Sequence, residues 1–158
     1  MAFLRESMDI ATPLSQVRER LCGDGRWLLP LADRATGDGE TLSMRLSPSS
    51  ARHRLGVPAK VRLDRCSEHG GTFLIPIRWE AATLSGLFPV LDGNVELSEI
   101  GDNACRLSLS ASYRPPLETV GGWLDRMAFH RVAESTVRSF LGLVASSLAE
   151  KQVTEDVR

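Results

Sequence analysis

An alternation of apolar and polar residues runs through much of residues 40–113, and no helical stretch interrupts it. A period of two is typical of half-buried β-strands. The apolar positions are Leu42, Met44 and Leu46; Val57, Ala59, Val61 and Leu63; Phe73, Ile75, Ile77 and Trp79; and Cys105, Leu107, Leu109, Ala111 and Tyr113. Val95 to Ile100 is predicted to form a further strand. Because no helix separates these strands, short turns must join them, and the sheet is predicted to be antiparallel.

The turns of this sheet are predicted from glycine, aspartate and asparagine. Residues 68–71 and 101–103 have turn composition, and Asp92-Gly93-Asn94 has the composition of a hairpin. Residues 81–89 fit either a short strand or a loop. Pro76 interrupts an otherwise regular strand, which indicates an edge or a bulge, because proline has no amide hydrogen for the ladder.

The segment from Leu117 to Glu150 contains no proline and is predicted to form one long helix after Pro115 and Pro116. One face of its C-terminal half is apolar at helical spacing. That face consists of Ala133, Val137, Phe140, Leu141, Val144 and Leu148. Further towards the N-terminus the same face carries Arg126, Phe129 and His130. A second apolar stripe lies on the other side of the helix in this half. The stripe consists of Leu117, Val120, Leu124, Met127 and Ala128.

This change of character has two interpretations. Either the helix bends at Gly121-Gly122 and the stripe is more core, or Arg126 and His130 face a cavity while the stripe meets loops or a partner. A buried arginine needs an ionic partner or water, because an unpaired charge in an apolar site is very costly. The sequence leaves both interpretations open.

The N-terminal part supplies a strand and two short helices. Phe3 to Ile10 alternates as a strand, Thr12 is a candidate helix cap, and Pro13 suits a first turn. That helix ends at Gly23, and residues 27–35 are predicted to form a second short helix or turn. The expected fold is therefore α+β: a curved antiparallel sheet of six to seven strands wrapped on a long C-terminal helix, with two short helices after the first strand. Residues 1–150 would form one domain, followed by a polar tail at 151–158.

Composition and charge restrict the cellular compartment that we expect for this protein. The net charge is −1 and no apolar run approaches the roughly 20 residues of a membrane span. Arg5, Glu6 and Asp9 exclude the apolar core of a signal peptide from the first ten residues. The cysteines, Cys22, Cys66 and Cys105, are odd in number and lack a C-x-x-C motif, so free thiols and the cytoplasm are expected.

The order of elements, together with several residues, resembles START-like and polyketide cyclase-like (SRPBCC) domains. The opening Asp9-Ile10-Ala11-Thr12-Pro13, followed by Val17, is similar to their first strand and helix, although Arg18 stands where tryptophan is common. The run Arg106–Leu109 through Tyr113–Pro116, then Gly121 and Leu124–Arg126, is similar to bacterial members of this superfamily. The resemblance implies a helix-grip fold with an apolar cavity between sheet and C-terminal helix. It carries no common catalytic residue set, so it does not determine function.

Candidate ligand-binding residues are large or polar groups on the inward faces and in adjoining loops: Trp79, Tyr113, Arg126, Phe129 and His130, with Trp27 and Phe88 as lid residues. Ligand pockets combine an apolar lining with a few placed polar groups. For each aromatic residue the competing interpretation is ordinary core packing. His130, Arg126 and Tyr113 are the catalytic candidates if the protein is an enzyme.

Other classes of site are not supported by the sequence. His53, His69 and His130 form no metal-binding motif, and no glycine-rich phosphate loop occurs, so neither a metal nor a cofactor is expected. Residues 45–65 are locally basic but contain no aromatic residue for base stacking, which argues against nucleic acid as a partner.

Three functions therefore remain. The favoured one is binding or transport of a hydrophobic or amphipathic small molecule, lipid or polyketide-like. The second is a cyclase or aromatase that uses His130, Arg126 and Tyr113. The third is an interaction module in which the second apolar stripe meets a partner, such as a second copy of the chain in a homodimer.

Overall fold

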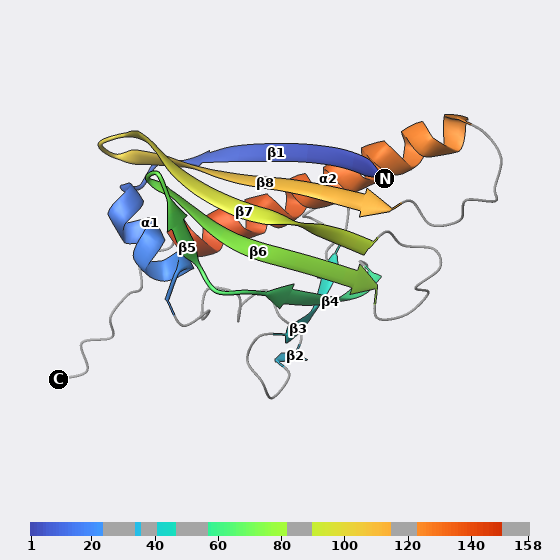
Figure 1. The fold of residues 1–158 in the computed structure, drawn as a ribbon, viewed down its shortest axis with the longest axis horizontal. Coiled ribbons are helices and arrows are strands. Elements are labelled where there is room, and N and C mark those ends of the chain that lie inside the picture. The colour runs from blue at the N-terminus through green and yellow to red at the C-terminus, as the bar shows by residue number, and fades with distance from the viewer. Residues whose placement is uncertain (24–33, 36–40, 47–56, 82–89, 115–122, 150–158) are drawn as a thin grey trace.

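A computed structural model describes residues 1–23, 34–35, 41–46, 57–81, 90–114 and 123–149, which contain eight strands and two helices (Figure 1). The strands are β1 (Ala2–Ile10), β2 (Arg34–Ala35), β3 (Thr41–Leu46), β4 (Val57–Leu63), β5 (Ser67–His69), β6 (Thr72–Ala81), β7 (Val90–Gly101) and β8 (Ala104–Arg114). The helices are α1 (Leu14–Leu21) and α2 (Trp123–Ala149).

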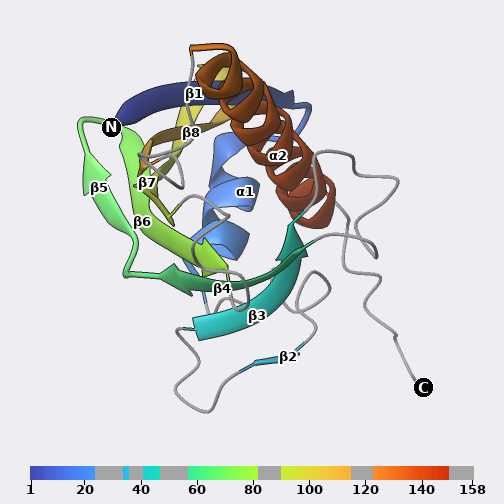
Figure 2. The same cartoon turned by 90° about the vertical axis from the view of Figure 1, so that its right-hand side faces the viewer.

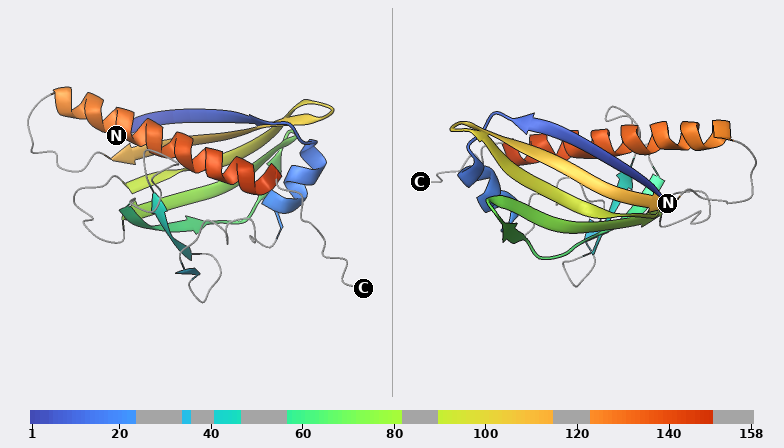
Figure 3. Two further views of the ribbon diagram at one scale, coloured as in Figure 1. Left: turned by 180° about the vertical axis from the view of Figure 1, so that it is seen from behind. Right: turned by 45° about the horizontal axis from the view of Figure 1, so that its top comes forward.

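All strand pairs are antiparallel, in the order β1-β8-β7-β6-β4-β3-β2, with β5 pairing onto β6. The sheet curves around α2, which runs along its concave side (Figure 2). Seen from behind, α2 crosses the sheet diagonally and α1 lies near its C-terminal end (Figure 3). The predicted helix-grip architecture is confirmed. The described sheet has eight strands rather than six or seven. The difference comes from β2 and β5, which are too short to leave an alternating pattern in the sequence.

The core lies between the sheet and α2. The inward residues of β8, from Cys105 to Tyr113, are buried, and so are those of β6, from Phe73 to Trp79. All six residues of the predicted apolar face of α2 are buried as well. The indole ring of Trp79 meets the ring of Phe140 edge to face, with centroids 5.4 Å apart, a preferred geometry for aromatic pairs. The alternation and the helical spacing thus identified both sides of the core correctly.

Helix α1 packs across one end of this core. Val17 and Leu21 are fully buried. The Arg20 guanidinium donates a hydrogen bond to the Leu148 carbonyl and so links α1 to the last turn of α2. Pro13 occupies the N-cap position in place of Thr12, and no side chain caps the first turn.

The predicted hairpin at Asp92–Asn94 is wrong, because these residues lie inside β7, paired with both neighbouring strands. A Cβ atom at Gly93 would approach the Ser110 carbonyl oxygen to 2.3 Å. Glycine is therefore present to allow a close approach of two backbones within the sheet, not to make a turn.

Pro76 lies in an interior strand, but opposite the gap between β4 and β5. On one side it pairs with Asn94 of β7. On the other, β4 pairs with β6 from Ile77 onwards and β5 up to Leu74, and the Pro76 carbonyl accepts a bond from the Asp64 amide at 3.0 Å. The missing amide hydrogen thus faces a break in the ladder, so proline is tolerated there without an edge position.

The prediction that Cys22 and Cys66 are free thiols is wrong. The two residues form a disulfide, with their Cα atoms 5.3 Å apart and a sequence separation of 44. Cys105 is free and buried, as expected, and burial raises the pKa of its thiol. Because two of the three cysteines are paired, the thiol argument for a reducing compartment no longer holds.

Other predictions fall partly or wholly outside the described residues. Arg34 and Ala35 form strand β2, whereas the rest of the predicted second helix, the bend at Gly121-Gly122, the 81–89 segment beyond Ala81 and the polar tail are not described.

Candidate functional site

The candidate site is formed by Tyr113 of β8 and His130 of α2. Tyr113 ends the buried row of β8 and is 2% exposed. Its hydroxyl oxygen lies 2.7 Å from Nδ1 of His130, and the two rings are nearly parallel, with an angle of 24° between their planes. The polar tip of a buried tyrosine therefore meets the one described imidazole on α2.

Glu134 extends this pair into a chain of three residues. It lies one turn after His130 on α2, and its Oε1 atom is 3.0 Å from Nε2 of His130. A carboxylate accepts hydrogen bonds, so Nε2 carries a hydrogen. In the neutral imidazole Nδ1 is then the acceptor, and the Tyr113 hydroxyl donates to it. Burial raises the pKa of Tyr113, and the negative charge of Glu134 raises it further, so the phenol stays protonated at neutral pH.

The chain has a directed hydrogen-bond pattern. When His130 is neutral, the hydrogen of the Tyr113 hydroxyl is used towards Nδ1, and the phenol oxygen is left to accept. When His130 is protonated, Nδ1 donates to Tyr113, and the Tyr113 hydroxyl can donate to another group. Glu134 orients the imidazole, as an acidic residue does for a catalytic histidine.

This chain lies at the edge of the core rather than in its centre. The His130 and Glu134 side chains are each 39% exposed, whereas Tyr113 is buried. The chain thus joins the apolar interior to solvent. A molecule with an apolar body and a hydrogen-bonding head group would match this change of polarity.

Trp79 lies in the same transverse row of the sheet as Tyr113. Trp79 pairs with Leu91, and Leu91 pairs with Tyr113, so one strand separates the two aromatic residues. With neighbouring strands about 4.8 Å apart, their backbones are about 10 Å apart. Trp79 is buried against Phe140, and so it packs in the core beside the Tyr113–His130 pair without bonding to it.

Of the seven predicted ligand-binding residues, the structure therefore brings Tyr113 and His130 into contact and places Trp79 nearby. Arg126 and Phe129 belong to α2, but the positions of their side chains are not described, and Trp27 and Phe88 lie outside the described residues. Their roles remain predictions. Glu134 was missed, although its spacing of four residues from His130 is the helical signal for a side-chain pair.

Met127 is the member of the second apolar stripe whose side-chain exposure the structure describes. Met127 is 51% exposed, in agreement with an outward orientation.

Among the described residues no group of histidine, cysteine, aspartate and glutamate could hold a metal ion. Within the same part of the chain, no helix is long and apolar enough to span a membrane.

Comparison by sequence finds no matching family model and no matching curated protein. Comparison by structure finds clear matches. A truncated norcoclaurine synthase from Thalictrum flavum is 13% identical, with a TM-score of 0.61 over 96% of this chain and 95% of that chain. A conserved protein from Geobacillus kaustophilus is 13% identical, with a TM-score of 0.57 over 94% and 95%.

A START superfamily protein from Mycobacterium smegmatis is 8% identical, with a TM-score of 0.53 over 92% of this chain and 96% of that chain. Each match spans nearly the whole of both chains, so the similarity concerns a complete domain and not one motif. At these identities it establishes the fold alone. The resemblance to START-like domains is thus confirmed at the level of architecture, and the chain has the helix-grip fold of the START and norcoclaurine synthase structures.

Proposed function

We propose that this protein binds an amphipathic small molecule between the sheet and the N-terminal half of α2, and that Tyr113, His130 and Glu134 recognise its polar head group. The hydrogen bond between Tyr113 and His130 is the observation that carries the proposal. It joins a buried phenol to a partly exposed imidazole, where an apolar ligand body and a polar head would each find a suitable environment.

The nature of the head group follows from the hydrogen-bond pattern. Tyr113 offers an acceptor lone pair when His130 is neutral, and a hydroxyl hydrogen when His130 is protonated. A ligand hydroxyl suits the first state and a ligand carbonyl the second. Lipids and polyketide-like aromatic compounds with such groups are the expected ligand classes.

Proton transfer is a second candidate function, and the same three residues support it. A tyrosine, a histidine and a carboxylate in series form a donor, a base and an orienting group. Protonated His130 would pass its Nδ1 proton to Tyr113 as the Tyr113 hydroxyl gives its own proton to the oxygen of a bound carbonyl compound, and Glu134 would hold the imidazole in place. Arg126 would polarise that carbonyl if its side chain reaches the site.

Mass spectrometry of the purified protein tests the proposal, first under native conditions and then after solvent extraction. Binding predicts a discrete small molecule that is lost on extraction and rebinds to the extracted protein. Rebinding should weaken in Tyr113→Phe. If no compound co-purifies and none from a cellular lipid or aromatic extract binds, the proposal is wrong. A discrete dimer mass without a ligand would favour the interaction module and the homodimer.

A further inference from the structure

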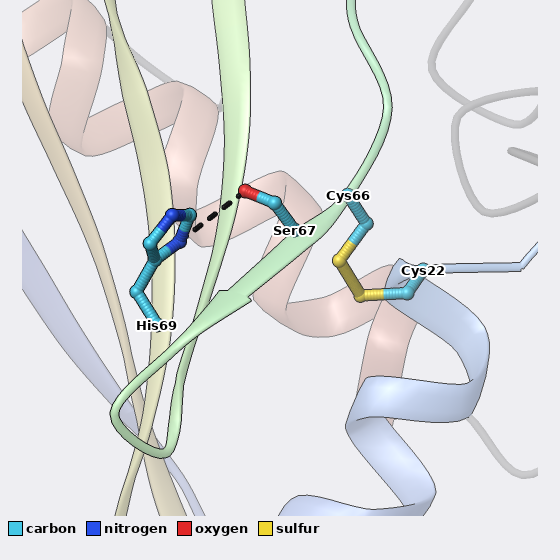
Figure 4. The surroundings of a disulfide bond; sticks show 4 residues. All are labelled: Cys22, Cys66, Ser67 and His69. Carbon is cyan, nitrogen blue, oxygen red and sulfur yellow. Dashed lines mark hydrogen bonds between the residues drawn. A yellow bond between two sulfur atoms is a disulfide. The ribbon is translucent and has the colours of Figure 1, made fainter.

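The disulfide between Cys22 and Cys66 lies at the opposite end of the molecule from the N-terminal half of α2. It connects the residue that follows α1 with the residue that precedes β5 (Figure 4). Neither cysteine is fully buried. Both line a pocket of about 360 Å³, so a small molecule can approach the sulfur atoms from solvent.

The lining of this pocket combines both signs of charge with one aromatic ring. Arg18 and Glu19 come from α1, Glu68 comes from β5, and Phe73 comes from β6. The guanidinium carbon of Arg18 lies 5.5 Å from the centre of the Phe73 ring. Arginine binds carboxylates, and glutamates bind ammonium groups, so the lining suits a small molecule that carries both groups.

We propose that this pocket binds a small zwitterionic thiol, of the size of an amino acid or short peptide, and that the Cys22–Cys66 bond exchanges with it. The ligand carboxylate would bind Arg18, and its ammonium group would bind Glu19 or Glu68. These two contacts would hold the thiol of the ligand next to the Cys22–Cys66 disulfide. Position, not only accessibility, then determines the rate of exchange.

The exchange is a balanced two-electron reaction. The ligand thiolate attacks one of the two sulfur atoms, a mixed disulfide forms, the Cys22–Cys66 bond breaks, and the other cysteine leaves as a thiolate that takes a proton from water. A second thiol molecule can displace the first, which leaves two protein thiols and an oxidised ligand dimer. His69 is not the base for these steps, because its imidazole faces Ser67, on the far side of the β5 strand from the disulfide (Figure 4).

The fold tolerates an open bond at this place. Helix α1 is held by the buried Val17 and Leu21 and by the bond from Arg20 to Leu148, none of which depends on the disulfide. On the other side, β5 has three residues, and all are exposed. Opening the bond therefore separates the segment before β5 from the end of α1. Strand β5 stays paired to β6, and the core stays packed. A partly exposed disulfide on which the core packing does not depend can act as an exchange site and not only as a structural link.

The test measures how fast reduced glutathione, a zwitterionic thiol, forms a mixed disulfide with the oxidised protein. 2-Mercaptoethanol, which is uncharged apart from its thiolate, is the comparison, at equal thiolate concentration. Samples are quenched with acid, alkylated and read by intact mass and peptide mapping. The variants are Arg18→Gln and Glu68→Gln, with Arg78→Gln as the control, because Arg78 pairs with Asp92 on β6 and β7 away from the pocket.

The proposal predicts a glutathione adduct on Cys22 or Cys66. Exposed ion pairs contribute about 0.2–1 kcal/mol, so Arg18→Gln and Glu68→Gln should each slow that reaction by up to about fivefold. The 2-mercaptoethanol reaction should not change in either variant, which also controls for folding. Equal slowing with both thiols, or no slowing, would overturn the proposal, as would alkylation of Cys22 and Cys66 in protein that was never reduced.

Discussion

The two halves of α2 lie against the same sheet but differ in character. In the C-terminal half, every residue of the predicted apolar face is buried, and Arg20 of α1 bonds to the carbonyl of the last buried residue, Leu148. In the N-terminal half, His130 and Glu134 are partly exposed and bond to each other, and Met127 faces outwards. One continuous helix thus combines a buried structural segment in its C-terminal half with partly exposed polar residues in its N-terminal half, and this change along its face is visible in the sequence.

Burial alone does not identify a candidate site on this fold. Trp79 and Tyr113 lie in one row of the sheet and are equally enclosed, yet Trp79 packs against Phe140 and Tyr113 bonds to a histidine. The polar partner distinguishes them. Changes in the C-terminal half should therefore affect stability, and changes around His130 should affect ligand recognition.

Leu141→Ala should have the largest effect on stability. Leu141 is 1% exposed, and truncation of a buried leucine costs about 2–5 kcal/mol because the lost contacts leave a cavity. Denaturant unfolding measures the loss. The exposed Ser146→Ala on the same half is the control and should change the free energy of unfolding by less than about 0.5 kcal/mol. If Leu141→Ala weakened ligand binding without loss of stability, the division of the helix would be wrong.

Tyr113→Phe should act mainly on binding. It removes one hydroxyl, and a hydrogen bond contributes about 0.5–1.5 kcal/mol, so affinity for a ligand with a polar head should fall about two- to tenfold. Stability should fall by about 1 kcal/mol through loss of the bond to His130. Titration calorimetry with the co-purified compound measures the affinity. An unchanged affinity would remove Tyr113 from the site.

Stability should also decrease at high pH because of Tyr113. Burial and the Glu134 charge raise the pKa of Tyr113 above the value of 10.0 for an unperturbed tyrosine. The neutral phenol is favoured in the folded state, so this contribution is complete below pH 10 and is lost as the pH rises through the folded-state pKa. Unfolding from pH 8 to 11 should show a decline that is smaller in Tyr113→Phe. Identical curves for both proteins would contradict the burial of the phenol.

Met127→Ser should have the smallest effect in a monomeric binding protein. The side chain is 51% exposed, so the change in the free energy of unfolding should stay within about 0.5 kcal/mol. Light scattering over a range of concentrations measures the mass of both proteins. A dimer that dissociates in Met127→Ser would show that the apolar stripe is an interface, and would support the interaction module.

Much of the fold could be predicted because two periods in the sequence are clear. The period of two placed Cys105 to Tyr113 on one face, and helical spacing placed Val137 and Leu148 on another. The strand conformation of Asp92–Asn94 could not be predicted, because the local preference of aspartate, glycine and asparagine for turns was outweighed by pairing with two neighbouring strands. The contact of Cys22 with Cys66 depends on tertiary structure, and no local pattern reports it.

The residues of the candidate site could be predicted in part for the same reasons. Tyr113 and His130 were found because each ends or interrupts an apolar face. Their contact joins residues of two elements, so it required the three-dimensional structure. Glu134 was overlooked because it lies beside the apolar face and resembles an ordinary solvated glutamate.

Nitrogen-15 NMR of the histidine rings tests most directly the proposal that Tyr113, His130 and Glu134 bind the head group of a ligand. Protein labelled at histidine would be measured as purified, after extraction of the bound compound and after its return. We expect neutral His130 to carry its hydrogen on Nε2, and its ring resonances to shift when the compound is removed and to recover on its return. His69, beside the glycine turn after β5, is the internal control and should not change. A binding site at Tyr113, His130 and Glu134 would be contradicted if the His130 resonances did not change on removal or return of the compound. A shift at His69 would contradict it as well.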